Sequence, residues 1–161
     1  MEKSTKGRLL DAALDLLGRE GAKAMTLRAV EEAAGVPHGS VRHHFGGQRG
    51  LLRALFDHLE TVERPAEGGL PAAVAQWLGP GRTVALARYE LFLLAARDEE
   101  LREPLVAARE RFVAQAATVV GEERARAVVA AVDGIVLDAL VRGEREPARV
   151  QAAIGALVAG V

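Results

Sequence analysis

The apolar and polar positions of this chain alternate with a helical period along most of its length. In residues 4–20 the apolar side chains recur three and four positions apart, which places them on one face of an α-helix. They are Leu9, Leu10, Ala13, Leu14 and Leu17. Ser4 or Thr5 can cap the start of this helix, and Gly21 can end it. The pattern therefore predicts one amphipathic helix over residues 4–20.

Two short helices joined by a tight turn are predicted next. Thr26 is a suitable N-cap for the first of them, and Gly35 would end it. Its buried face would consist of Leu27, Val30 and Ala33 or Ala34. The second would run from about residue 38 to 44, with Val41 facing inward and Phe45 closing the unit. A helix-turn-helix presents its second helix to the major groove of DNA in this way.

The rest of the pattern predicts six more helices, separated by two breaks. The breaks are residues 64–71, rich in Pro and Gly, and the triplet Gly79, Pro80 and Gly81. The helices are expected at residues 51–62, between the two breaks, and at 82–97, 98–119, 122–142 and 147–159. No segment favours a strand. The fold class is therefore predicted as all-α, with about nine helices.

Composition limits the classes of protein that fit. The chain has 161 residues, 50% of them hydrophobic, so it can bury a core and form one or two small domains. Ala, Leu, Val, Arg and Glu are abundant, which favours helix over sheet. The absence of cysteine excludes disulfide scaffolds and cysteine-rich zinc sites and fits a cytoplasmic protein. No long apolar run occurs, so neither a signal peptide nor a membrane span is predicted.

Charge is distributed unevenly along the chain. The net charge of −1 argues against indiscriminate binding of polyanions. Residues 1–58, however, carry nine Lys and Arg against seven Asp and Glu, together with all four histidines. Residues 59–161 carry 12 against 15. The excess positive charge therefore lies in the same part of the chain as the short helix pair.

The last two predicted helices are unusually apolar. Residues 128–141 are apolar almost all round, apart from Asp133, Gly134 and Asp138. Such a helix lies either in the centre of a core or at a subunit interface. Because a chain of this size has little core in which to bury it, we favour a homodimer formed through the last two helices. A buried monomer core is the alternative, and Asp133 would lie at the dimer seam or face water.

Four fragments between residues 8 and 56 follow one another in a specific order. Residues 21–28 read Gly-Ala-Lys-Ala-Met-Thr-Leu-Arg, residues 33–36 read Ala-Ala-Gly-Val, and residues 39–45 fit Gly-Ser-Val-x-x-His-Phe. Leu-Leu then begins the next helix. This order resembles the N-terminal domain of TetR-family transcriptional regulators. The other two thirds of the chain resembles that family in layout only.

The resemblance implies a DNA-binding domain at residues 1–47 and a helical effector-binding and dimerisation domain at residues 48–161. It further implies a ligand-responsive repressor that binds a near-palindromic DNA operator as a homodimer, with a small-molecule effector that weakens DNA binding. The alternative hypothesis is a helical ligand-binding or protein-interaction module that has lost DNA readout.

The resemblance also places the residues that would contact DNA. They are Thr26, Arg28, His38, Gly39, Ser40, Arg42, His43 and Arg49. Arg42 is the best candidate for a strong contact, because a guanidinium can hold a phosphate or reach guanine. Gly39 would allow close approach to DNA or merely start the helix, and Ser40 would bind DNA or merely cap it. His44 is expected to pack under Phe45.

Three positions depart from the usual family pattern. The common Ser before the recognition helix is Pro37, so a side-chain cap is lost. The usual Tyr is Arg42, and the usual Lys at the start of the fourth helix is Gln48, with Arg49 beside it as a substitute. These changes alter individual phosphate contacts but keep the surface positive.

Other chemistry has weaker support. Trp77, Arg88, Tyr89, Phe92 and Phe112 are candidates for an effector pocket, although the core is the commoner place for such side chains. The four histidines lack a Cys or carboxylate at a metal-ligand spacing, so no metal site or cofactor is predicted, and His58 is expected on a helix surface. No catalytic motif occurs, and an enzyme is not predicted.

Overall fold

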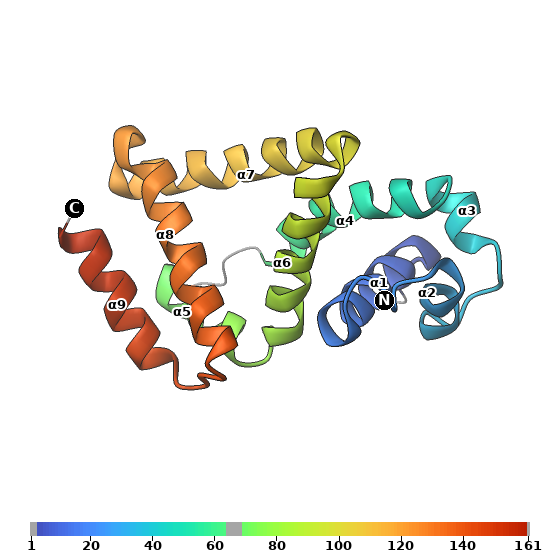
Figure 1. Cartoon of the computed structure of the whole chain (residues 1–161), viewed down its shortest axis with the longest axis horizontal. Helices are drawn as coiled ribbons and strands as arrows, with labels where there is room; N and C mark the ends of the chain where they lie inside the picture. The colour runs from blue at the N-terminus through green and yellow to red at the C-terminus, as the bar shows by residue number, and fades with distance from the viewer. Residues whose placement is uncertain (1–2, 64–68, 161) are drawn as a thin grey trace. The chain divides into compact units, whose positions relative to one another are not determined.

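The computed structural model describes residues 3–63 and 69–160, and within them it contains nine α-helices and no strand (Figure 1). This confirms the predicted fold class. Of the predicted break at residues 64–71, residues 64–68 lie outside the described part of the chain. The other three residues begin a helix.

The described residues form two compact units. The N-terminal unit contains residues 3–63 and 83–105, and the C-terminal unit contains residues 69–82 and 106–160. The helices of the N-terminal unit are α1 (Thr5–Glu20), α2 (Leu27–Ala33), α3 (Ser40–Phe45), α4 (Gln48–Val62), α6 (Arg82–Arg97) from its second residue, and the first turns of α7 (Glu99–Val120). The rest of α7 belongs to the C-terminal unit, with α5 (Gly69–Leu78), α8 (Glu122–Val141) and α9 (Pro147–Gly160).

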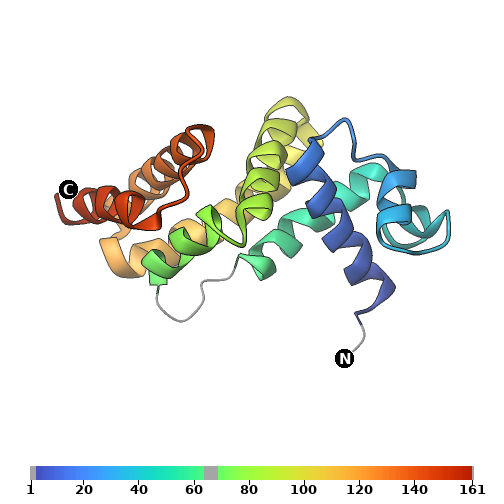
Figure 2. The same cartoon turned by 90° about the horizontal axis from the view of Figure 1, so that it is seen from below.

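The predicted apolar stripe of α1 forms the centre of the N-terminal unit. All five of its members are buried, and Ser4 caps the helix by accepting a hydrogen bond from the Gly7 amide at 3.1 Å. α1 packs against α2 and α4, while α3 packs against α2 and α4. Figure 2 shows α2 and α3, in light blue, side by side at the start of α4. The short helix pair is therefore supported by α1 and α4.

A polar pair joins α1 to α4. His58 Nε2 lies 2.8 Å from Asp11 Oδ1, and the imidazole is only 18% exposed. The expectation that His58 is an ordinary surface residue was therefore wrong, because α1 covers that side of α4. Burial opposes ionisation of Asp11, but hydrogen bonds from Lys3 and His58 outweigh it and lower the pKa of the carboxyl.

The C-terminal unit is built around α8, which packs against α5 and α9. Seven of its apolar side chains are buried, among them Val128, Val132 and Val136. Asp133 forms an ion pair with Arg109 of α7 at 2.8 Å. No described helix is long and apolar enough to cross a membrane.

Candidate nucleic-acid interface and ligand pocket

The start of α2 follows the sequence prediction, and its buried face follows it in part. Thr26 caps the helix by accepting a hydrogen bond from the Ala29 amide at 3.2 Å. Val30 is fully buried, Leu27 and Ala34 are half-buried, and Ala33 is exposed. The second buried residue of α2 is Glu31, which no apolar pattern could indicate.

Glu31 fixes the start of α3. One carboxylate oxygen, Oε1, accepts hydrogen bonds from the Gly39 amide at 3.0 Å and from the Val41 amide at 2.9 Å. The other, Oε2, lies 3.4 Å from Nδ1 of His38. The Glu31 side chain is only 5% exposed. A carboxylate of α2 therefore supplies the acceptor that the first amides of α3 lack within their own helix.

The electrostatics of Glu31 agree with this geometry. The Val41 amide, followed by the Gly39 amide and His38, holds the pKa of Glu31 below its ordinary value against the opposing effect of burial. The carboxylate is therefore charged at neutral pH. The N-cap residue of α3 is Gly39, which has no side chain with which to cap the helix itself.

α3 begins two residues later than predicted. Residues 37–40 form a turn in which the Ser40 amide donates to the Pro37 carbonyl at 3.3 Å, and Gly39 has a φ of 92°. A residue with a side chain rarely adopts that φ, so glycine is required here for the turn rather than for helix formation. The Ser40 hydroxyl donates to the Pro37 carbonyl at 2.5 Å. α3 then runs through Phe45 with Val41 fully buried.

The exposed face of α3 carries three consecutive basic or titratable side chains. Arg42, His43 and His44 are all exposed. The imidazoles of His43 and His44 meet edge to face, with ring centroids 4.9 Å apart. The expectation that His44 packs under Phe45 was wrong, because Phe45 only meets the His44 ring edge, with centroids 6.3 Å apart. α3 therefore presents a cation and two imidazoles to solvent.

Two of the predicted DNA-binding arginines are engaged in ion pairs. Arg28 Nε donates to Glu32 Oε1 at 2.8 Å on the exposed side of α2, and this hydrogen bond raises the pKa of Arg28. Arg49 Nη1 lies 2.9 Å from Glu100 Oε2, and its Nη2 lies 3.4 Å from Asp98 Oδ2. Exposed pairs of this kind are weak. Both guanidiniums can therefore exchange their carboxylate for a phosphate at small cost.

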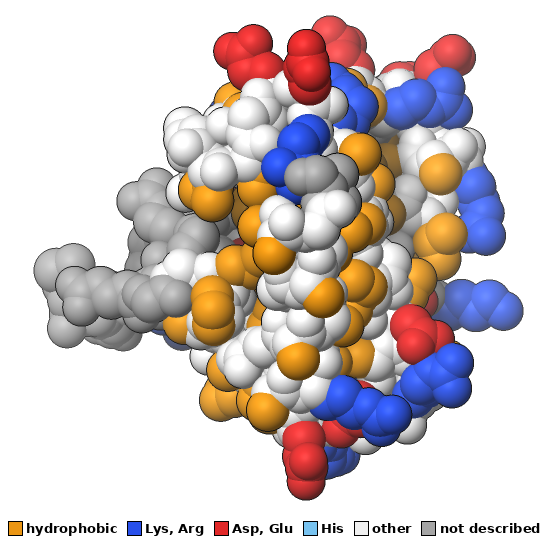
Figure 3. Space-filling model, turned by 90° about the vertical axis from the view of Figure 1, so that its left-hand side faces the viewer, with side chains coloured by type: hydrophobic (Ala, Val, Ile, Leu, Met, Phe, Trp, Pro, Cys, Tyr) orange, Lys and Arg blue, Asp and Glu red, His pale blue; other side chains and the backbone are white. Residues whose placement is uncertain are grey.

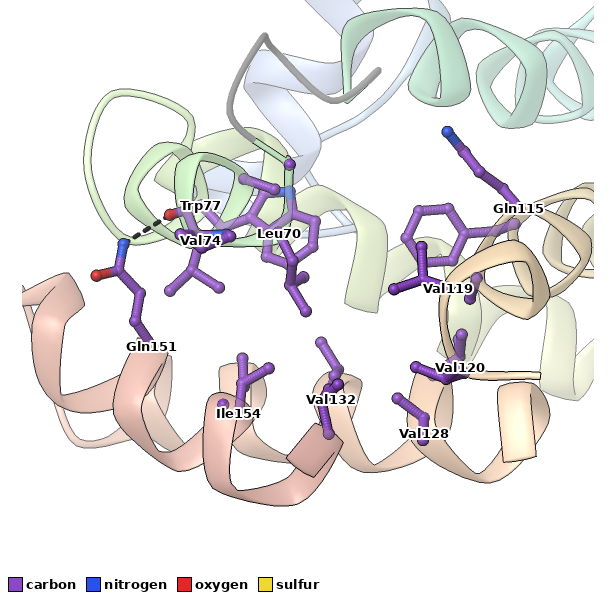
Figure 4. Close-up of a pocket in the computed structure, with 18 residues that line it drawn as sticks. Leu70, Val74, Trp77, Gln115, Val119, Val120, Val128, Val132, Gln151 and Ile154 are labelled. Atoms are coloured by element: carbon purple, nitrogen blue, oxygen red, sulfur yellow. Dashed lines mark hydrogen bonds between the residues drawn. The ribbon is translucent and has the colours of Figure 1, made fainter. Parts of the chain in front are cut away.

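The C-terminal unit contains a pocket of about 510 Å³ between α5, α7, α8 and α9 (Figure 4). Valine is the commonest residue in its walls, which include Trp77 and Phe112 of the predicted effector residues. Gln115 and Gln151 contribute the polar side chains of the lining. A largely apolar cavity of this size is suited to one drug-sized ligand.

The other three predicted effector residues lie in the N-terminal unit. Arg88 is 8% exposed and forms an ion pair with Glu63 at 2.8 Å, and its Nη2 donates to the Tyr89 hydroxyl at 3.2 Å. Tyr89 and Phe92 meet edge to face with ring centroids 5.9 Å apart. The structure thus brings Trp77 and Phe112 to one pocket but not the three residues of α6. Within the described residues, no group of three His, Asp or Glu side chains could hold a metal ion.

Comparison with known proteins covers both halves of the chain. Residues 9–55 match the family model described as bacterial regulatory proteins of the tetR family. Residues 60–160 match the model of the tetracyclin repressor-like C-terminal domain. The chain belongs to the TetR family. The order of motifs in residues 8–56 is thereby confirmed as a TetR-family pattern.

Individual TetR-family relatives show how far the similarity extends. The transcriptional repressor Rv3405c of Mycobacterium tuberculosis is 33% identical over 110 residues, which are 65% of this chain and 58% of the relative. The chain spans about half the length of the curated relatives it matches. A TetR-family structure from Streptomyces coelicolor A3 is 29% identical with a TM-score of 0.79, covering 96% of this chain and 98% of that one.

A third relative was solved with a ligand. The multidrug binding protein EbrR complexed with ethidium is 28% identical with a TM-score of 0.73. The alignment covers 96% of this chain and 98% of that chain. TetR-family members are transcriptional regulators, and the helix-turn-helix of residues 26–45 is the part of this chain that fits DNA recognition.

Proposed function

We propose that this protein is a ligand-responsive transcriptional regulator that binds operator DNA through α3. The observation that carries the proposal is the exposed row Arg42, His43 and His44 on a short helix whose start is fixed by Glu31. α3 would enter the major groove, and Thr26, Arg28 and Arg49 would contact phosphates at its edges. His38, Gly39 and Ser40 would lie at the entry of the helix. A protein that binds operator DNA would act in the cytoplasm.

DNA binding and effector binding are assigned to successive parts of the chain in this proposal. Residues 1–47 would form the DNA-binding domain, and residues 48–161 would bind the effector and form the dimer. Effector control would be a shift between conformers, since a ligand that prefers the conformer with wrongly placed recognition helices weakens DNA binding. The pocket of the C-terminal unit, with Trp77 and Phe112 in its wall, supports a ligand-responsive protein. The complex of EbrR with ethidium supports the same proposal.

A homodimer through α8 and α9 is supported by apolar residues that the chain leaves exposed. Ala127, Ala130, Gly134, Leu137 and Val141 lie three and four residues apart along α8 and are all exposed. Leu137 is 41% exposed and Val141 is 78% exposed. Figure 3 shows hydrophobic side chains across the middle of the face that carries α9, with charged side chains at its edges. A repressor dimer of this kind would act on a near-palindromic site.

Fluorescence anisotropy on DNA from upstream of the protein's own gene tests the proposal. Random DNA serves as competitor, and the salt concentration is varied. We expect tight binding that survives competitor and weakens as salt rises, because phosphate contacts release counterions. Failure to prefer any sequence, in this assay and in a selection from random oligonucleotides, would contradict the proposal.

The alternative, a helical binding module that has lost DNA readout, is favoured by the ion pairs of Arg28 and Arg49. In such a module, the carboxylates of Glu32, Asp98 and Glu100 would keep these two arginines in ion pairs. The two functions differ in their response to salt. A module without DNA readout would show only weak binding that disappears equally from every DNA sequence as salt rises.

Replacing Arg42 with alanine should weaken operator binding by roughly 1–3 kcal/mol and relax the preference at one base position, if its guanidinium reaches a base edge. The measurement is anisotropy on the operator and on single-base variants of it. Arg19→Ala is the matched control, because Arg19 has the same charge and is exposed on α1, outside the proposed interface. Equal losses from the two variants would reject the role of Arg42.

A further inference from the structure

The pocket of the C-terminal unit has a wall made almost wholly of hydrocarbon. Figure 4 shows Leu70, Val119, Val132 and Ile154 converging on the open space from four different helices. Trp77 and Phe112 add aromatic surface to the same lining. Unfilled, such a cavity would leave these side chains without van der Waals partners on one side. A ligand that fills it must therefore offer mainly apolar surface.

The polar side chains of the lining lie at its edge. Gln151 Nε2 donates to the Pro71 carbonyl at 2.6 Å, so its amide is turned toward the first turn of α5 rather than into the space. Gln115 is exposed, and Figure 4 shows its amide pointing away from the converging side chains. These two amides can give a ligand a hydrogen bond at the rim. They cannot neutralise a charge inside.

No described residue of the lining carries a charge. Asp133, which follows the lining residue Val132, is held by Arg109 at 2.8 Å. A cation or an anion that entered this pocket would lose part of its hydration without gaining a partner of opposite charge, which is unfavourable. We propose that the pocket binds neutral, largely aromatic or aliphatic molecules and excludes charged ones of the same shape. This inference rests on the proposed function and names the chemical class of the effector.

The chain provides its own reporter for this site. Trp77 is the only tryptophan in the sequence and lines the pocket. A molecule that enters the pocket should therefore quench or shift the whole tryptophan emission of the protein. Such a titration needs no DNA, so its result stands apart from the outcome of the operator assay.

Two probes with nearly the same ring system separate the charge states. N-phenylnaphthylamine is neutral, and anilinonaphthalenesulfonate carries an added sulfonate. We expect the neutral probe to bind at least about tenfold more tightly than the sulfonate, because the charged group must be desolvated without a partner. Ethidium serves as the cationic probe and should also bind at least about tenfold more weakly than the neutral one.

Filling the pocket should remove the binding. Val132 is 6% exposed in the lining, whereas Val106 is 48% exposed on α7 and lies outside it. Val132→Phe should reduce neutral-probe affinity at least about tenfold, while Val106→Phe should leave it unchanged. Ala116→Phe, from the α7 wall, is a second filling variant, and thermal unfolding checks that each variant is folded.

Each outcome decides the proposal. Preference for the neutral probe, lost in the folded filling variants, supports it. Equal or tighter binding of ethidium or of the sulfonate overturns the proposed chemical class. Absence of binding by every probe overturns the pocket as a small-molecule site. Neutral-probe binding that falls as the protein associates also overturns it and indicates that a second copy covers the pocket. If the protein bound the neutral probe but no operator DNA, the proposed regulator would be rejected and the proposed ligand class would remain.

Discussion

Replacing Glu31 with alanine should reduce operator affinity by at least about tenfold, although the Glu31 side chain is buried and is not among the proposed DNA contacts. The change leaves the Gly39 and Val41 amides without the carboxylate that now accepts from both. Unsatisfied buried amides are costly, so the first turn of α3 would fray and Arg42 would lose its orientation. The measurement is anisotropy on the operator, with thermal unfolding to confirm that the protein remains folded.

Two further variants separate positioning from simple damage. Glu31→Gln keeps an oxygen that can accept both hydrogen bonds, so it should retain most of the affinity that alanine loses. Pro37→Ser in the Glu31→Ala background adds a hydroxyl that can accept a hydrogen bond from the Gly39 amide two residues on, so it should recover part of the lost affinity. Wild-type operator affinity in Glu31→Ala would show that Glu31 does not position the helix. The same conclusion would follow if neither of the two further variants bound the operator more tightly than Glu31→Ala.

The Glu31 carboxylate also makes a contribution to the free energy of unfolding that depends on pH. Because the folded protein holds the pKa of Glu31 below its ordinary value of 4.5, the folded state binds fewer protons than the unfolded state in that range. The stability that Glu31 adds is therefore complete above pH 4.5 and is lost as pH falls toward the lowered pKa. Wild type should be more stable than Glu31→Gln at neutral pH, and denaturant unfolding should show this difference shrinking below about pH 4.5. A difference that stays constant into the acid range would contradict the prediction.

Replacing Gly18 with alanine should destabilise the N-terminal unit by about 1–3 kcal/mol or more. A Cβ atom at this position would lie 1.9 Å from the carbonyl oxygen of Thr83, at the start of α6. That oxygen belongs to the backbone and cannot rotate away, so α1 and α6 would have to separate. Denaturant unfolding measures the loss directly.

Gly7→Ala is the matched control on the same helix. The nearest atom to a Cβ there is Ser4 Oγ at 3.5 Å, an ordinary contact distance. Because alanine favours helix over glycine, this variant should be neutral or slightly stabilising. If Gly18→Ala and Gly7→Ala changed the free energy of unfolding equally, the close approach of α1 to Thr83 would not limit the residue at position 18.

The helices themselves could be predicted from local sequence. The five apolar side chains of α1 and the caps Ser4 and Thr26 depend on residues within a turn or two, so periodicity and capping rules identify them. The family motif at residues 8–56 is equally local, and its match to residues 9–55 confirms it. The DNA-contacting residues and the dimer stay predictions, because no DNA and no second copy test them.

Two contacts that local sequence did not reveal join residues that are distant in sequence. His58 is covered because α1 brings Asp11 to it, and Arg88 is occupied because Glu63 reaches it. Neither pairing can be recognised from the periodicity of the sequence, because a polar residue on one helix does not indicate which other helix will cover it. Trp77 and Phe112 share a pocket for the same kind of reason, as they come from α5 and α7.

The sequence by itself determined that this protein is helical, which segments form its helices, and which family motif its first third carries. These properties follow from interactions within one or two turns of chain. Only the tertiary structure decided that Glu31 caps α3, that Gly18 meets Thr83, and that four helices line one pocket without a charged side chain among its described residues. The physical reason is that periodicity specifies which face of a helix is buried, whereas the partner of that face is set by packing between segments far apart in the chain.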